Sequence, residues 1–363
     1  MENLSRRDVL AGAASVILGA GAAPGISSQP EPKPVGWAIL GLGSYATRQI
    51  LPNMRFCTRS KPVAFISGSP EKARRFARQY GVAEHSIYNY ENLEKIANNP
   101  EIEVVYVLTP PGTHAGFTIR SLKAGKHVVC EKPMASSSQE CREMIATARQ
   151  MGKRLQIGYR CHFEPHNLEA MRLCRQGAVG KIHTVRSDHG FKLDWDGGWH
   201  TDGRLGGFGA ISEIGVYSIQ ALCYLTGEEP TAVWGTSHKS DARRFREVED
   251  LNHFNLFFPS GAQGIGATAY SWNANNFRVL GTEGNIDAEP ATGYGGHVFR
   301  RNGRPIEVAA ANQWARQMDH MSECVRDPQK TLVAPGEMGL RDIEIIEAVL
   351  RSAQTGSVVS LAG

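Results

Sequence analysis

Two polar side chains in this sequence, Lys132 and Tyr217, could together carry out acid–base chemistry on an alcohol or carbonyl group. Lys132 follows the apolar run His127–Cys130 in the segment HVVCEKP. If that run is a parallel strand, Lys132 lies just past its carboxyl end, the edge at which open α/β sheets bind ligands. A lysine there can hold a substrate oxygen by charge and hydrogen bonding, although a surface lysine in a turn is the ordinary alternative.

The segment SEIGVYS supplies Glu213 and Tyr217, which are four residues apart. On one helix these two side chains share a face, and the preceding GGFG offers a flexible N-terminus that allows close approach. A carboxylate and a phenol would then point into one cleft opposite Lys132. A tyrosine packed in a core with its hydroxyl satisfied is equally consistent with this spacing.

A second set of residues indicates a dinucleotide-binding turn. The motif G-x-G-x-x-G/A is formed by Gly41, Leu42, Gly43, Ser44, Tyr45 and Ala46. The first glycine permits a tight turn, the second lets the backbone approach a pyrophosphate, and the small sixth residue lets helix and strand pack closely. Backbone N–H groups and the helix N-terminus would meet the phosphates. A glycine-rich turn without a ligand is the alternative, but the βαβ pattern that follows favours the nucleotide.

The end of the second expected strand, Ile66-Ser67-Gly68-Ser69, favours NADP over NAD. An NAD site usually places Asp or Glu there to hold the ribose 2′-hydroxyl, yet no carboxylate occurs before Glu71. Ser67 and Gly68, with Lys72 and the nearby arginines 74 and 75, suit a 2′-phosphate. The same letters also make a good helix start, with an N-cap serine and a proline at the first position, and both interpretations can hold together.

These residues need a framework, and the first part of the chain predicts one of alternating strands and helices. Strands are expected at Val35–Leu40, Val63–Ser67, Val104–Thr109, His127–Cys130 and Arg154–Gly158. Helical segments are expected between them at residues 45–54, 69–80, 93–98, 114–124 and 138–151. Such alternation predicts a doubly wound parallel sheet of the Rossmann type over residues 35–158, in a protein of the α/β class.

After residue 158 the pattern predicts an α+β domain over residues 159–363 with a large, mostly antiparallel open sheet. Strands are expected at residues 182–188, 231–238, 252–258, 262–270, 278–282 and 284–288, and helices at 165–175, 212–225, 315–326 and 338–352. The last of these helices could pack back on the first domain. An open sheet leaves one face to be covered, so we expect a homo-oligomer, either a dimer or a tetramer.

Composition narrows the class of protein. The 363 residues suffice for two domains, and the net charge of +4 is too small to indicate a nucleic-acid partner. The seven cysteines are odd in number and lack CxxC spacing, so neither a disulfide framework nor a metal site is expected.

The N-terminal sequence is typical of an export signal. Ser5-Arg6-Arg7-Asp8 precedes an apolar stretch, 9–23, that is too short and too rich in Ala and Gly to span a membrane well. The paired arginines are typical of twin-arginine signals, with an ordinary secretory signal or a buried helix as alternatives. Residues 1–34 are therefore interpreted as a signal and a Pro-rich arm.

Taken together, the segments GLGSYA, LTPPGTH, AGKHVVCEKPMA, IGYRCHFEPHN and SEIGVYS resemble the Gfo/Idh/MocA family of oxidoreductases from about residue 36 to 355. Within the family the similarity points to the glucose–fructose and periplasmic aldose–aldose oxidoreductases. The resemblance assigns Lys132 to the site of the nicotinamide and substrate oxygen, and Tyr217 to the catalytic tyrosine. Glu213, where the family usually has Asp, would bind sugar hydroxyls. Further cofactor-lining residues would be Thr109, Pro110, His114, Glu131 and Arg160; further substrate-binding residues would be Arg160, His162 and Trp199.

The resemblance also implies an activity and a location. Tyr217 would take the C1 hydroxyl proton of an aldose while the charge of Lys132 lowers the pKa of the phenol, giving an aldonolactone and NADPH. The reverse half-reaction would reduce a second sugar, aldose or ketose, to its alditol. A periplasmic enzyme has no free NADP pool, so the cofactor would be tightly bound before twin-arginine export, with no membrane anchor after signal cleavage. An NAD(P)-dependent aldose dehydrogenase with exchangeable cofactor and a non-catalytic sugar-binding protein are the alternatives.

Overall fold

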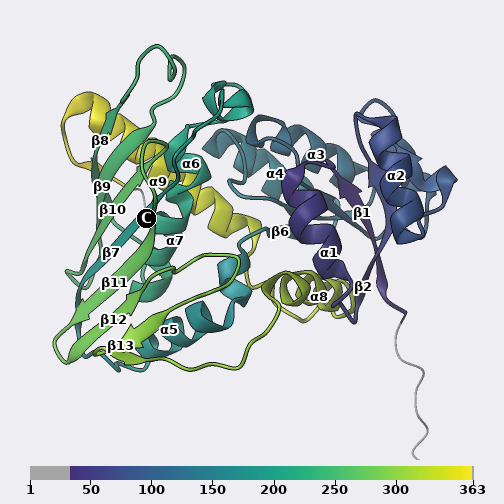
Figure 1. The fold of residues 1–363 in the computed structure, drawn as a ribbon. Coiled ribbons are helices and arrows are strands. Elements are labelled where there is room, and N and C mark those ends of the chain that lie inside the picture. The colour runs from purple at the N-terminus through teal and green to yellow at the C-terminus, as the bar shows by residue number, and fades with distance from the viewer. Residues whose placement is uncertain (1–32, 362–363) are drawn as a thin grey trace, which may run out of the picture. The chain divides into compact units, whose positions relative to one another are not determined.

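A six-stranded parallel sheet, in the order β3-β2-β1-β4-β5-β6, forms the first lobe (Figure 1). The computed structural model describes residues 33–361, and the chain from Pro34 onward forms one compact unit. The strands are β1 (Val35–Leu40), β2 (Ser60–Ile66), β3 (Ile87–Tyr88), β4 (Val104–Val107), β5 (His127–Cys130) and β6 (Leu155–Ile157). This strand order is that of a Rossmann fold, which confirms the predicted α/β class.

Helices cover both faces of this sheet, so its central strands are buried and almost wholly apolar. They are α1 (Leu51–Met54), α2 (Pro70–Tyr80), α3 (His114–Lys123) and α4 (Ser138–Gln150). The helix expected over residues 45–54 begins with a π-helical stretch, Ala46–Ile50, and the expected helix at Leu93–Asn98 is a 3₁₀ segment. Ser69 caps α2 as its sequence position suggested, since its hydroxyl accepts a hydrogen bond from the Lys72 N–H at 3.3 Å.

A nine-stranded sheet forms the second lobe, in the order β14-β13-β12-β11-β7-β10-β9-β8-β15. Only β7 and β10 run parallel, and every other neighbouring pair is antiparallel, as predicted. The strands are β7 (Ile182–Gly190), β8 (Ala232–His238), β9 (Leu251–Phe257), β10 (Gln263–Ala269), β11 (Ala274–Gly281), β12 (Gly284–Ala288), β13 (Phe299–Arg301), β14 (Arg304–Pro305) and β15 (Val359–Ser360). The last three were not expected, because two or three residues are too few to show a period.

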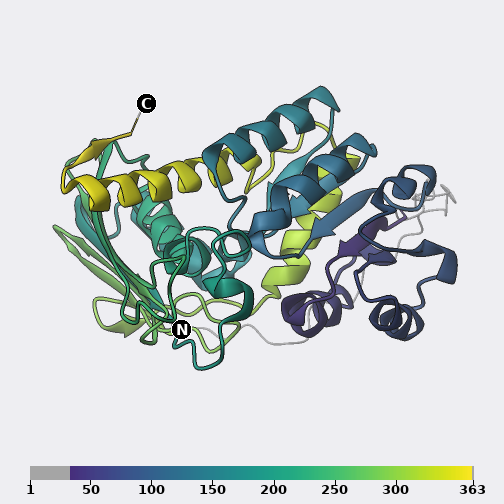
Figure 2. The same cartoon turned by 90° about the horizontal axis from the view of Figure 1, so that it is seen from above.

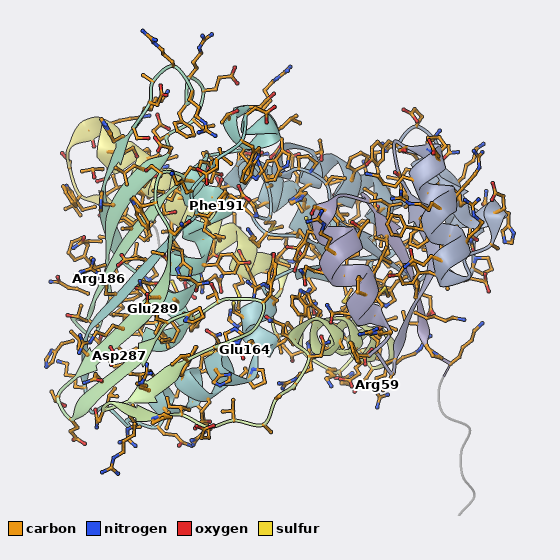
Figure 3. All side chains as sticks on the ribbon, in the orientation of Figure 1. Arg59, Glu164, Arg186, Phe191, Asp287 and Glu289 are labelled. Carbon is orange, nitrogen blue, oxygen red and sulfur yellow. The ribbon has the colours of Figure 1, made fainter. Side chains whose placement is uncertain are left out.

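Helices lie on one face of the second sheet and leave the other open. The lobe contains α5 (Pro165–Arg175), α6 (Ala210–Glu213), α7 (Gly215–Thr226) and α9 (Gly336–Thr355); α7 packs on β7 and β10, and α9 on β8. On the strands, Trp234, Ile265 and Leu280 remain more than a third exposed. Charged side chains such as Arg186 and Asp287 project from the same sheet (Figure 3).

The helix expected at residues 212–225 is divided in two, so Glu213 and Tyr217 do not share one continuous helix. Glu213 ends α6, Ile214 lies between the two helices with φ −108° and ψ −33°, and α7 begins at Gly215. A Cβ at Gly215 would lie 2.8 Å from the Thr268 side chain, so the start of α7 rests directly on β10.

Two C-terminal helices reach the first lobe (Figure 2). The helix α8 (Gln313–Arg326) packs on the parallel sheet, where Trp37 Nε1 donates to Ser322 Oγ at 3.0 Å and Asp319 accepts from Ser60 Oγ at 2.8 Å. The helix α9 lies along α4, and an ion pair between Arg142 and Glu344 at 2.6 Å joins them. The second half of the chain therefore completes the core of the first lobe.

The expected export signal and nearly all of the Pro-rich arm lie within residues 1–32, outside the described residues. Between residues 33 and 361, no helix has both the length and the apolar character that a membrane crossing requires. All seven cysteines are free, and all but Cys57 are buried.

Candidate active site

A cavity of about 680 Å³ lies where the carboxyl ends of the parallel strands face the second lobe. From the first lobe come the loops after β1, β4, β5 and β6. From the second lobe come the end of β7 at Phe191 (Figure 3), the segment around Trp199, and the α6–α7 junction. The predicted residues that line it are Gly43, Ser44, Tyr45, Thr109, Pro110, His114, Glu131, Lys132, Arg160, Trp199, Glu213 and Tyr217.

The glycine-rich turn after β1 has the shape of a phosphate cradle. Gly41 has φ +94°, and a Cβ there would lie 2.8 Å from the Leu108 carbonyl oxygen, so only glycine fits. Gly43 faces open space, with no atom within 4 Å of the position its Cβ would take. Leu42 and Ala46 are buried and anchor the turn from beneath. An exposed, side-chain-free backbone at a strand-to-helix turn fits the pyrophosphate of a nicotinamide dinucleotide.

The end of β2 lies beside this turn. Lys72 Nζ donates to the Leu42 carbonyl at 3.3 Å, and Ser67 Oγ accepts from the Ser69 N–H at 3.1 Å. Gly68 packs under the Tyr90 ring, where a Cβ would approach to 2.9 Å. The structure therefore brings Ser67, Gly68 and Lys72 next to the nucleotide turn, although they lie outside the cavity itself.

Lys132 and Tyr217 meet in the cavity from opposite lobes. Lys132 Nζ donates to the Glu213 carbonyl oxygen at 2.5 Å and lies 5.0 Å from the centre of the Tyr217 ring. The Arg160 guanidinium is 5.2 Å from the same ring centre and 4.9 Å from that of Tyr294. Two cations therefore lie close to one phenol.

Arg160 is the cation that lowers the pKa of Tyr217 most, whereas the sequence predicts this role for Lys132. Burial raises the pKa of Tyr217 to about 12, and the positive charge of Arg160 is the strongest influence in the opposite direction. Arg160 is held by Gln313 Oε1 at 2.9 Å, the Gly293 carbonyl at 3.0 Å and the Thr292 carbonyl. Its buried Nε has no hydrogen-bond partner among the described residues and is a spare donor beside the cavity. At neutral pH the phenol is protonated.

Glu213 is a buried carboxylate fixed by two side chains that the sequence did not predict to contact it. Its Oε2 accepts from the Tyr270 hydroxyl at 2.7 Å, and its Oε1 lies 3.3 Å from His200 Nε2. Burial alone would raise the pKa of Glu213, but the His200 hydrogen bond, the charge of Lys132 and the Tyr270 hydroxyl hold it below its ordinary value. His200 is stacked on Trp199 with ring centres 3.8 Å apart. The carboxylate is thus charged and rigid at the cavity wall.

The His200–Glu213 pair is expected to make stability depend on pH. Burial lowers the pKa of His200, but the hydrogen bond and charge of Glu213 raise it overall. The free energy of unfolding that His200 contributes is therefore fully present below its ordinary pKa of 6.5. It is lost as pH rises through the raised pKa. The free energy of unfolding that Glu213 contributes is fully present above its ordinary pKa of 4.5. It is lost as pH falls through the lowered pKa. The variant His200→Gln should lose about 1.5–3 kcal/mol of unfolding free energy between these limits, as measured by denaturant unfolding across pH.

The matched control for this experiment is His85→Gln, which replaces an exposed histidine of the first lobe. Its unfolding free energy should follow that of the unchanged protein at every pH. If the deficit of His200→Gln were the same at pH values well above the raised pKa, a charged pair would not be its cause.

Glu131 and His114 organise the loops around Lys132. Glu131 Oε1 accepts from the Tyr106 hydroxyl at 2.6 Å, and burial raises the pKa of this carboxyl despite that hydrogen bond. A Cβ at Gly158 would lie 2.6 Å from Glu131 Oε1, so this carboxylate requires a glycine opposite it. The His114 ring lies 2.7 Å from the Thr109 carbonyl and 2.8 Å from the Pro133 carbonyl. It thereby ties the loop after β4 to the segment that follows Lys132.

His162 was expected to bind substrate, but the structure does not bring it to the cavity. The short 3₁₀ turn Arg160–Phe163 directs Arg160 into the cavity and His162 into the second lobe. There its Nε2 lies 2.6 Å from Gln220 Oε1, and its ring meets that of Tyr224 edge to face. Cavity residues that the sequence did not indicate by any motif are Phe191, Asn275, Thr292, Gly293 and Tyr294.

A Rossmann sheet whose glycine-rich turn opens onto a cavity with a lysine, an arginine and a tyrosine defines an oxidoreductase that uses a nicotinamide dinucleotide. The family model for the oxidoreductase family with an NAD-binding Rossmann fold (GFO_IDH_MocA) matches residues 35–159, and the GFO/IDH/MocA C-terminal domain matches residues 167–287. The chain belongs to the GFO/IDH/MocA oxidoreductase family.

Several relatives act on sugars. The solved structure of an aldose–aldose oxidoreductase from Caulobacter crescentus, complexed with glycerol, is 44% identical with a TM-score of 0.88, over 91% of this chain and all of that one. D-xylose 1-dehydrogenase [NADP(+)] from Haloarcula marismortui is 29% identical over 90% of this chain and 93% of its own length. 1,5-anhydro-D-fructose reductase from Ensifer adhaerens is 27% identical over 90% of this chain and 98% of its own. The chain is therefore an oxidoreductase of this family that is similar to several proteins named for sugar substrates.

Proposed function

We propose that this protein oxidises an aldose at C1 to the aldonolactone and passes the hydride to a second sugar, which is reduced to its alditol, with one tightly bound NADP serving both half-reactions. The observation that carries the proposal is the placement of Lys132 Nζ 5.0 Å from the Tyr217 ring centre, in a cavity that the nucleotide turn also lines. The similarity to an aldose–aldose oxidoreductase supports the pairing of two sugar substrates.

The chemistry of each cavity side chain gives it a separate role in the two half-reactions. The bound nicotinamide supplies reversible hydride transfer. Tyr217, protonated at neutral pH, is set to donate its proton to the carbonyl oxygen of the acceptor sugar. The phenolate left by that step would then receive the C1 hydroxyl proton of the next donor sugar, which restores the phenol. Lys132 and Arg160 stabilise negative charge on the reacting oxygen and on the phenol. The Glu213 carboxylate accepts hydrogen bonds from sugar hydroxyls, and the Trp199 ring offers an apolar face for stacking.

Retention of NADP rather than NAD depends on the residues at the end of β2. The replacement Lys72→Ala should lower the preference for NADP over NAD about 10- to 150-fold, because it removes a charge-assisted contact to the 2′-phosphate worth about 1.5–3 kcal/mol. The measurement is the ratio of the two nucleotides retained after nucleotide-free protein is incubated with an equimolar mixture. Lys95→Ala removes an exposed lysine of the same lobe and serves as the control. An unchanged ratio in Lys72→Ala would remove Lys72 from the NADP site.

Export by the twin-arginine route would explain why one cofactor serves both half-reactions, since a periplasmic enzyme cannot draw on a cytoplasmic NADP pool. The Arg6-Arg7 pair before the apolar stretch supports this location. Assembly into a dimer or tetramer through the open face of the second sheet is part of the proposal, because Trp234, Ile265 and Leu280 are exposed there. Cell fractionation and the mass of the mature protein in solution test these two points; a cytoplasmic monomer would contradict both.

An NADP-dependent aldose dehydrogenase with exchangeable cofactor is the second candidate, favoured by the similarity to D-xylose 1-dehydrogenase [NADP(+)]. One experiment separates the two functions. Nucleotide released by denaturation is identified and counted, and the intact protein is then given single sugars and pairs of sugars while products are identified. Stoichiometric NADP, together with a lactone and an alditol from a pair, supports the proposal. Protein that is empty and needs added NADP supports the dehydrogenase, and no turnover with any sugar contradicts both.

A further inference from the structure

Outside the cavity, one carboxylate and two imidazoles converge at the start of α5 (Figure 3 labels Glu164). Glu164, His166 and His297 each place one ligand atom within 4.8 Å of the other two. His166 Nδ1 lies 3.1 Å from Glu164 Oε1, and His297 Nδ1 lies 3.6 Å from the same oxygen. Ligands that share a Zn²⁺ ion at about 2.0–2.2 Å lie roughly 3–3.5 Å from one another. Only small side-chain movements separate this cluster from that geometry.

Hydrogen bonding orients His297 as a metal ligand would be oriented. Its Nε2 lies 3.1 Å from the Gly293 carbonyl oxygen, which can only accept, so Nε2 carries the proton. Nδ1 therefore presents a lone pair toward the Glu164 carboxylate. In the neutral ring that lone pair faces a carboxylate oxygen, a repulsive arrangement that either a proton on Nδ1 or a bound cation would relieve. Metal-bound histidines characteristically donate their outer N–H to a carbonyl or carboxylate in this way.

Glu164 is held rigidly by hydrogen bonds at the start of α5. Its Oε2 accepts from the Asn167 N–H and Nδ2, both at 2.7 Å, as the N-cap of α5, and its Oε1 accepts from the His166 N–H at 3.1 Å. His166 Nδ1 also lies within hydrogen-bond distance of Oε1, at 3.1 Å, so an ion bound between the imidazoles and Glu164 would take the place of that contact. The side chains of Glu164 and His297 are 4% and 7% exposed, whereas that of His166 is 23% exposed. An ion could therefore enter past His166 and keep water at its remaining positions.

From this arrangement we infer that Glu164, His166 and His297 bind one borderline divalent transition-metal ion, of the class of Zn²⁺ or Co²⁺. Two imidazole nitrogens and one carboxylate oxygen suit such ions, whereas Ca²⁺ and Mg²⁺ prefer oxygen ligands throughout. The ion would fasten the segment Gly293–His297 to α5. That segment also holds Arg160 through the Gly293 carbonyl and contributes Tyr294 to the cavity wall. Sequence spacing does not predict this site, because His297 is remote from the EPH segment along the chain.

The test uses the tag-free full chain after treatment with a chelator. Zn²⁺ is titrated calorimetrically and Co²⁺ by its visible d–d absorption, and thermal unfolding is recorded with and without Zn²⁺. We expect one ion per chain and a Tm raised by the bound ion. His166→Asn and His297→Asn should each weaken binding about 100-fold, since even loss of an outer hydrogen bond to a ligand costs about 10–100-fold. His183→Asn, at an exposed position on β7, should bind as the unchanged protein does.

Two results would overturn the inference. One is the absence of saturable binding of either ion to the folded, chelator-treated protein. The other is unchanged affinity in the double variant His166→Asn/His297→Asn. Because His166 is partly exposed, its single variant should fold even if replacement of the buried His297 does not. None of these measurements uses turnover, so they are independent of the sugar activity.

Discussion

Replacement of Lys132 by methionine is expected to lower kcat for sugar oxidation about 100- to 1,000-fold, the usual cost of losing one preorganised donor at a reacting oxygen. Lys132 contributes a full positive charge inside a largely buried cavity, directly past β5, and its Nζ is fixed by the Glu213 carbonyl at 2.5 Å. Methionine keeps the length and apolar stem of the side chain without the charge. The rate is read from the near-ultraviolet absorbance of reduced nicotinamide in a single half-reaction.

Nucleotide content separates a loss of chemistry from a loss of cofactor. Lys132→Met should still release NADP in the same amount on denaturation, while Lys95→Met, at an exposed position, should match the unchanged protein in both rate and content. A Lys132→Met protein that reduces its nucleotide at an undiminished rate would exclude Lys132 from the reaction.

The second large effect is expected for Tyr217→Phe, which should lower the rates of both half-reactions about 100- to 10,000-fold, the range for loss of a general acid–base group. Phenylalanine retains the ring that lies near Lys132 and Arg160 and stacks on His189, so packing is preserved. The missing hydroxyl is the group that exchanges the proton. Because its pKa is raised to about 12, the remaining activity should also lose the dependence on pH that this phenol imposes at high pH.

Single-turnover rates for oxidation of the donor and reduction of the acceptor measure this prediction. Tyr80→Phe removes a hydroxyl from the end of α2, outside the cavity, and is the matched control. If Tyr217→Phe slowed only one half-reaction, two different acid–base groups would serve the two sugars and the shared-site proposal would fail.

The first lobe was predictable because its signals are local. The apolar run before Gly41, the spacing within GLGSYA and the alternation of strands with helices are properties of short segments. The edge at which Lys132 lies follows from them, since all strands of a parallel sheet end on the same side. The antiparallel second sheet was also predicted, apart from strands too short to show a period.

The details of the cavity depended on contacts that sequence spacing does not encode. Glu213 and Tyr217 lie in the cavity together although the helix between them is broken at Ile214. His162 is directed away from the cavity by a single 3₁₀ turn, whereas Arg160, two residues earlier, becomes the main charge beside Tyr217. Patterns of apolar residues predict helices and strands, but they carry no information on which distant polar groups a buried side chain meets.

The sequence alone determined the two-lobed α/β architecture, the nucleotide turn and the position of Lys132 past a strand, because periodicity and turn chemistry act over a few residues. Tertiary structure decided which groups these side chains meet. Tyr270 and His200 contact the Glu213 carboxylate, and Gly293 and Gln313 accept hydrogen bonds from Arg160. The helix α8 packs in the core of the first lobe. Each of these joins a side chain to residues remote along the chain. Buried polar groups must find such partners wherever the fold brings them, so only the folded chain specifies the site.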